Sequence, residues 1–83
     1  MLKVSVISPE ATLFQGEVDS VIAPAFDGEV GILTSHAPMM TLLGKGILKL
    51  GAQGAAGRVA VEGGFLQVVY DNVRVVTEKA TKA

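Results

Sequence analysis

Apolar and polar residues alternate with a period of two along most of this chain, and this pattern constrains the fold more than any other feature. Near the start, Leu2, Val4 and Val6 fall on one face of a predicted strand, while Lys3 and Ser5 fall on the other. No window of eleven or more residues shows convincing helical periodicity. Successive side chains of a strand point to opposite faces, so this alternation is typical of half-buried β-sheets. The sequence therefore predicts an all-β domain.

The other predicted strands are short and separated by turn residues. They cover residues 17–23, 46–50, 59–62, 65–70 and 73–77. Pro24 is expected to end the first of them, and Asp71-Asn72 to form a two-residue hairpin turn. The pair Gly63-Gly64 predicts a bulge or a close approach between two strands. We expect about eight to ten strands in a flattened β-sandwich or barrel.

Three other segments carry weaker signals. Residues 51–57, rich in glycine and alanine, predict a flexible hairpin tip. In 37–43 the proline at 38 limits any helix to a turn or two. The polar tail, 78–83, is expected to fray.

Composition limits both the domain count and the class of function. At 83 residues the chain is one domain, 1–83, and without cysteine it has neither a disulfide nor a cysteine-based zinc site. Its net charge of −1 comes from interspersed charges, which argues against nucleic-acid binding. No apolar stretch approaches the length of a bilayer span, and the first residues resemble a strand more than a signal peptide.

The chain is apolar for its size, which points to a partner protein. Hydrophobic residues make up 49% of it, and the mean hydropathy is +0.49. We expect part of this apolar surface to face a partner. The alternative is that alanine and valine in a tightly packed sandwich raise the mean hydropathy without forming an exposed apolar patch.

Catalytic and cofactor chemistry finds little support in the residues. His36 is the only histidine, and the adjacent Ser35 would point away from it on a strand. One histidine with scattered carboxylates forms no metal-ligand cluster. We expect no catalytic residue, metal or cofactor. The rival interpretation is a biotinyl or lipoyl carrier domain, which would expose Lys45 on a hairpin, but the Gly-Lys-Gly context matches those domains poorly.

The run from Asp27 to Leu50 contains four glycines and a proline among apolar residues. It closely resembles the signature of the epsilon subunit of F-type ATP synthases: Gly-Glu-Leu-Gly-Ile, a short turn, His-Ala-Pro, two apolar residues and Thr. The matching positions are Glu29, Gly31, Ile32, His36, Ala37, Pro38 and Thr41. The segments 63–68 and 72–76 also resemble that family, so the likeness covers the whole chain.

The resemblance implies a non-catalytic rotor-stalk subunit that binds the γ subunit and the c ring and couples proton translocation to ATP synthesis. It implies a place peripheral to the energy-transducing membrane, on the cytoplasmic or stromal side, with membrane contact only through the complex. The C-terminal helical pair of the family is expected to be absent. By resemblance, the γ-facing residues are Ser8, His36, Met39, Met40 and Thr41. The c-ring contact is expected at Asp27 and Glu29, in a Gly-Glu-x-Gly turn.

Overall fold

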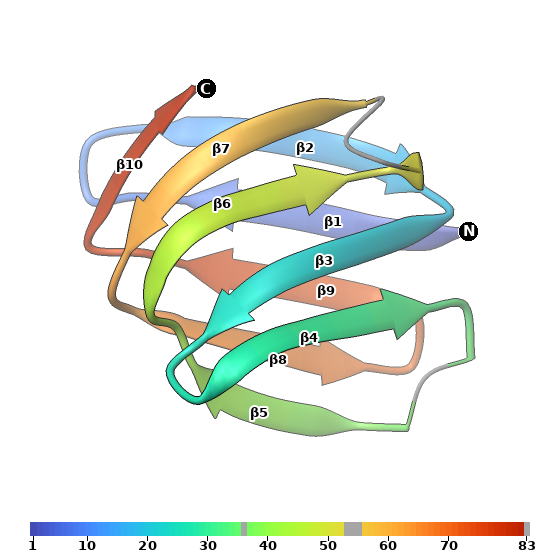
Figure 1. Ribbon diagram of the computed structural model, residues 1–83. Helices are drawn as coiled ribbons and strands as arrows, with labels where there is room; N and C mark the ends of the chain where they lie inside the picture. The colour runs from blue at the N-terminus through green and yellow to red at the C-terminus, as the bar shows by residue number, and fades with distance from the viewer. Residues whose placement is uncertain (36, 53–55, 83) are drawn as a thin grey trace.

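The computed structural model describes residues 1–35, 37–52 and 56–82, which form two five-stranded sheets packed face to face (Figure 1). Sheet A has the order β2 (Thr12–Val18), β1 (Leu2–Ile7), β9 (Asn72–Val76), β8 (Phe65–Val69), β5 (Met39–Leu42). Sheet B has the order β10 (Lys79–Lys82), β7 (Gly57–Glu62), β6 (Lys45–Leu50), β3 (Ser20–Ala25), β4 (Gly28–Leu33). Of the named strand pairs in these residues, only β1 with β9 is parallel. The predicted all-β sandwich is confirmed.

The core lies between the two sheets and is built from the apolar half of each alternating strand. In β6, Leu48 and Leu50 are fully buried, while Ile47 and Lys49 lie on the outer face. The predicted facing of β1 is confirmed, and in β7 Val59 and Val61 are buried in the same alternating way. The buried cluster consists of Leu2, Val4, Val6, Val18, Val21, Ala23, Ile32, Leu43, Leu48, Leu50, Val59, Val61, Leu66, Val68, Val73 and Val75. Each large aliphatic side chain buried here contributes about 1.5–3 kcal/mol.

Three connections cross between the sheets side by side at one end of the sandwich (Figure 1). They are β5 to β6 at Leu43-Gly44, β7 to β8 at Gly63-Gly64, and β9 to β10 at Thr77-Glu78. We call this region the glycine junction. Backbone hydrogen bonds join the first two connections, from Leu43 N to Gly64 O (2.9 Å) and from Gly63 N to Gly44 O (3.3 Å).

The third connection is bonded to the second through a buried side chain. The Thr77 hydroxyl lies 3.0 Å from the Gly63 carbonyl oxygen and 2.9 Å from that of Lys79. Both glycines of the second connection have positive φ, 73° at Gly63 and 102° at Gly64. The predicted close approach at this pair is therefore confirmed.

Several boundaries differ from the sequence predictions. The segment predicted as 17–23 divides at Asp19 into the end of β2 and the start of β3, and Pro24 lies inside β3. Pro24 is tolerated there because the pairing of β3 with β6 covers only Val21 and Ile22, and its carbonyl accepts a bond from Gly44 N (2.8 Å). The helical turn allowed for 37–43 is wrong, since residues 39–42 form β5 as an edge strand on β8.

Two further predictions near the end of the chain are wrong. The hairpin between β8 and β9 turns at Tyr70-Asp71, one residue earlier than predicted, because Val69 pairs with Asn72. The tail does not fray over its whole length: β10 pairs antiparallel with β7 and forms the edge of sheet B. The proposed tip at 51–57 includes residues 53–55, which lie outside the described residues.

A methyl group at Gly64 tests the glycine junction. A Cβ there would collide with the carbonyl oxygen of Val76 and lie 2.6 Å from the Thr77 Cα. We expect Gly64→Ala to lower the free energy of unfolding by more than about 3 kcal/mol, measured by urea denaturation. Gly31→Ala is the matched control, because a Cβ at Gly31 meets nothing within 4 Å, and it should change stability by less than about 1 kcal/mol. Equal stability of the two variants would contradict this account of the junction.

Candidate interaction surfaces

An apolar row crosses the outer face of sheet A next to the glycine junction. Strand register places its members directly opposite one another, in the order Leu42 on β5, Phe65 on β8, Val76 on β9 and Ile7 on β1. Leu42 is 62% exposed, and the other three are half-buried. Neighbouring apolar side chains on the solvent side of a sheet are typical of a surface that binds another protein. We call this set the apolar row.

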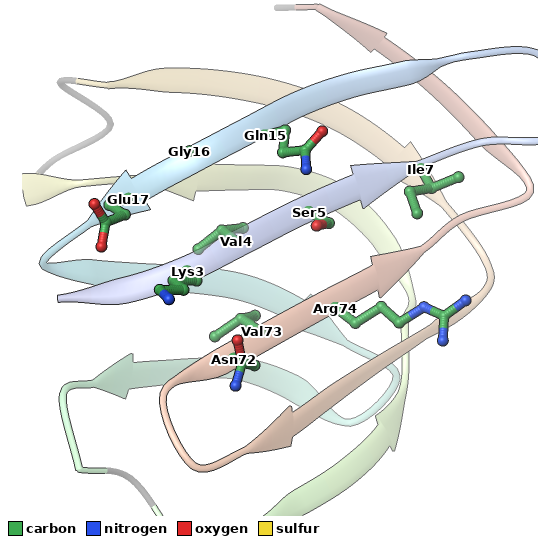
Figure 2. A pocket seen from close by; sticks show the side chains of 10 residues that line it. All are labelled: Lys3, Val4, Ser5, Ile7, Gln15, Gly16, Glu17, Asn72, Val73 and Arg74. Atoms are coloured by element: carbon green, nitrogen blue, oxygen red, sulfur yellow. The ribbon is translucent and has the colours of Figure 1, made fainter.

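A polar groove occupies the other part of the same face, over β2, β1 and β9 (Figure 2). Lys3 lies between Asn72 and Glu17 in the strand register, and Ser5 lies between Arg74 and Gln15. Figure 2 shows Lys3 and Glu17 toward one end of the groove and Ile7 and the Arg74 guanidinium toward the other. Lys3 and Glu17 are thus direct cross-strand neighbours of opposite charge, an arrangement that favours the pairing of β1 with β2.

The methionines expected to face γ lie on opposite faces of β5. Met39 pairs with Val68 and packs against the core, half-buried. Met40 points to the outer face and is 64% exposed. Thr41 lies opposite the buried Leu66 on the inner side and is also half-buried. Of these three, Met40 is the residue with its side chain available to a partner.

The structure does not bring Ser8 together with them. Ser8 follows β1 at the end of the sandwich that carries the glycine junction, and its hydroxyl is 3.2 Å from both the amide nitrogen and the carbonyl oxygen of Ala11. The connection from β4 to β5 lies at the opposite end (Figure 1). His36 lies in that connection but outside the described residues.

The acidic pair expected to contact the c ring lies at the hairpin between β3 and β4. Ala25 pairs with Gly28, so Phe26 and Asp27 form the two-residue turn. The Gly-Glu-x-Gly spacing predicted Glu29 in the turn, but Glu29 is the second residue of β4, opposite Pro24. Asp27 and Glu29 are both exposed and belong to the same hairpin end. Phe26, 67% exposed at the turn, was not singled out by the sequence analysis.

The described residues show little sign of carrier, metal or membrane-spanning chemistry. Lys45 is the first residue of β6, opposite Glu62, and not at a hairpin tip as a carrier lysine would be. No group of three or more histidine, cysteine, aspartate or glutamate residues in the described ranges could hold a metal ion. The same ranges contain no helix of the length and apolar character needed to cross a bilayer.

Comparison with known proteins identifies the family. The family model for the ATP synthase delta/epsilon chain, beta-sandwich domain, matches residues 1–83. The chain belongs to this family. The suspected relationship to the epsilon subunit is thereby confirmed, and the carrier-domain alternative receives no support.

Curated relatives agree with the family model. The chain is 46% identical over 77 residues to the ATP synthase epsilon chain of Leptospira interrogans. That alignment covers 93% of this chain and 61% of the relative. It is 42% identical over 82 residues to the ATP synthase epsilon chain of Dehalococcoides mccartyi, covering 99% of this chain and 59% of the relative. The chain thus spans about three-fifths of the length of these relatives.

Solved structures share the fold. This chain superposes on a chain of the Euglena gracilis mitochondrial ATP synthase, in an assembly described as OSCP/F1/c-ring, with a TM-score of 0.86 at 23% identity. That match covers 98% of this chain and 52% of the other. A chain of the Tetrahymena thermophila mitochondrial ATP synthase central stalk and c-ring gives a TM-score of 0.78 at 16% identity, covering 96% of this chain and 65% of that one. At these identities the likeness shows the β-sandwich fold.

Proposed function

We propose that this chain serves as the β-sandwich domain of a rotor-stalk subunit of F-type ATP synthase, where it binds γ and the c ring and couples proton translocation to ATP synthesis. Its role is mechanical and non-catalytic. It sits beside the energy-transducing membrane, on the cytoplasmic or stromal side, and contacts the membrane only through the complex. The observation that carries the proposal is the apolar outer surface of sheet A in a chain of this family, formed by the exposed Met40 and Leu42 and the half-buried remainder of the apolar row.

This surface is suited to a protein partner. Met40 and Leu42, 64% and 62% exposed, project from an edge strand, and Phe65 continues the apolar surface inward from Leu42. Methionine adapts its shape to irregular partner surfaces. The two-sheet core behind the row holds these side chains on a rigid support, which suits a part that transmits torque. The curated relatives that match the chain are named ATP synthase epsilon chain, in keeping with a place in the stalk.

Substitutions at the two adjacent methionines separate binding from folding. Met40→Asp places a carboxylate on the outer face, so it should weaken binding of γ by roughly 2 kcal/mol, about thirtyfold in Kd, while the domain stays folded. Met39→Asp places the carboxylate against the core and should instead lower the free energy of unfolding by about 2–4 kcal/mol. Calorimetry with purified γ and urea denaturation measure the two effects.

Ile47→Asp is the control for Met40→Asp. Ile47 is 38% exposed, but it lies on β6 on the outer face of the other sheet, away from sheet A and from both ends of β4, and this variant should bind γ like the wild type. If Met40→Asp binds γ with unchanged affinity and an intact circular dichroism spectrum, the γ-binding face is not sheet A.

The c-ring contact is proposed at the hairpin that carries Asp27 and Glu29. Two exposed carboxylates near the turn suit a basic loop of a partner subunit. An exposed ion pair contributes only about 1 kcal/mol or less, so its role is to set the register of the contact.

Reversing the charge at Glu29 tests the c-ring contact. Glu29→Lys should lower proton-coupled ATP synthesis in reconstituted complexes by less than about tenfold, with the fold and γ binding retained. Glu10→Lys, an exposed glutamate in the turn between β1 and β2, is the control and should leave coupling unchanged. Cysteines at position 29 and in the polar loop of the c subunit should cross-link in the assembled, active complex. Absence of that cross-link would rule out the contact.

A further inference from the structure

Two connections meet at the end of the sandwich opposite the glycine junction. The amide nitrogen of Ser35, between β4 and β5, donates a 2.8 Å hydrogen bond to Oδ1 of Asp71, in the turn between β8 and β9. Residues from both segments line one hollow, which we call the turn corner: Ser35, Ala37, Pro38, Tyr70 and Asp71. The bond joins segments 36 residues apart in the chain and fixes the shape of the corner.

The turn corner holds backbone conformations that side chains rarely adopt. Among the described residues, Ser35 (φ 68°) and Tyr70 (φ 54°) are the non-glycine residues with positive φ. Tyr70 is the first residue of a two-residue hairpin turn, where glycine or asparagine is preferred. It is also 80% exposed, so burial of the ring in this domain does not offset the strain. Strained residues that persist in folded proteins concentrate at functional sites.

The chemistry of the turn corner favours a basic partner group with a flat face. The aromatic ring of Tyr70, together with Ala37 and Pro38, gives the hollow a mainly apolar lining, and Asp71 adds a carboxylate. An arginine guanidinium stacks on aromatic rings and pairs with carboxylates, and it is more weakly hydrated than a lysine ammonium. Tyrosine and arginine are both enriched among the residues that dominate binding energy at protein interfaces.

We propose that the turn corner receives an arginine side chain of the γ subunit, which stacks on Tyr70 and faces the carboxylate of Asp71. Asp71 is also a positioning residue, because its bond to Ser35 N holds the segment that leads to the exposed Met40. This inference rests on the proposed function. The corner is assigned to γ and not to the c ring because Ala37 and Pro38 lead directly into β5, whereas Asp27 and Glu29 lie at the other end of β4.

Substitutions at Tyr70 separate the ring from the backbone strain. Tyr70→Asn removes the ring but suits positive φ, so the temperature midpoint of unfolding should stay unchanged or rise, while the Kd for γ rises about tenfold or more. Tyr70→Phe keeps the ring and should bind γ within about twofold of the wild type. Wild-type affinity in Tyr70→Asn would overturn the proposal.

Substitution at Asp71 separates charge from positioning. Asn can still accept the hydrogen bond from Ser35 N, so Asp71→Asn removes only the negative charge. We expect its Kd for γ to rise about fivefold and its affinity to depend less steeply on salt than that of the wild type. Asp19→Asn is the control, an exposed aspartate between β2 and β3, and should behave like the wild type. An unchanged Kd and salt dependence in Asp71→Asn would argue against a cationic partner group.

Photo-crosslinking identifies the occupant directly. With p-benzoylphenylalanine at position 70, irradiation of the assembled complex should capture γ, and the modified peptide should contain or adjoin an arginine. Capture of the c subunit, or of a γ peptide without a nearby basic residue, would contradict the proposal. These experiments distinguish failure of the proposed function from failure of this inference. If the wild-type chain does not bind γ, the proposed function is wrong. If the wild type binds γ tightly and Tyr70→Asn binds it equally well, only the arginine site at the turn corner is wrong.

Discussion

The backbone packing at the glycine junction is the constraint on which the rest of this sandwich depends. Three sheet-to-sheet crossings lie side by side there, at a separation that leaves no room for a Cβ at Gly64 beside the Val76 carbonyl. Gly44 N donates to Pro24 O (2.8 Å) in the same region, and Phe26 N donates to Leu42 O (3.0 Å). These bonds tie the ends of β3 and β5 together and close the sandwich at one corner. A small domain has few other means of holding two sheets in one alignment.

The alignment set at the junction determines what the outer face of sheet A presents. Phe65 and Val76 are the residues next to the crossings on β8 and β9, and their pairing places them beside Leu42 and Ile7. A slip of one residue would turn each strand over and move the apolar row into the core. The proposed partner surface and the core are therefore specified together, by the same register. A substitution that separates the connections at the glycine junction would therefore disturb the core and the apolar row together.

The sequence was sufficient for the all-β class and for the facing of strongly alternating strands such as β1, because period-two alternation is a local property of each segment. Pairing between strands is not local, and the predictions that were wrong depend on it. The tail is polar and becomes β10 by pairing with β7, where Ala80 lies opposite the buried Val61. The short segment 39–42 becomes β5 by pairing with β8, which lies more than twenty residues later. Tyr70 takes positive φ against its own preference because the register of β8 with β9 requires the turn there. Family resemblance predicted that residues 39–41 face γ, and the structure was needed to distinguish Met40, on the outer face, from Met39, on the inner face.

The geometry of β4 bears on how one small domain could serve two partners. Its six residues span about 17–20 Å, with the carboxylates of the β3–β4 hairpin at one end and the turn corner beyond the other. On the proposed function, the c ring meets the first end, and γ meets the second end together with sheet A. Because β4 is paired with β3 along all six of its residues, it resists bending, so a displacement at one contact is carried to the other. The Ser35–Asp71 bond extends that rigidity past the end of β4 into the connection to β5. A rigid link between two contacts is the physical requirement of a part that transmits rotation, and a helical hinge at this position would not meet it.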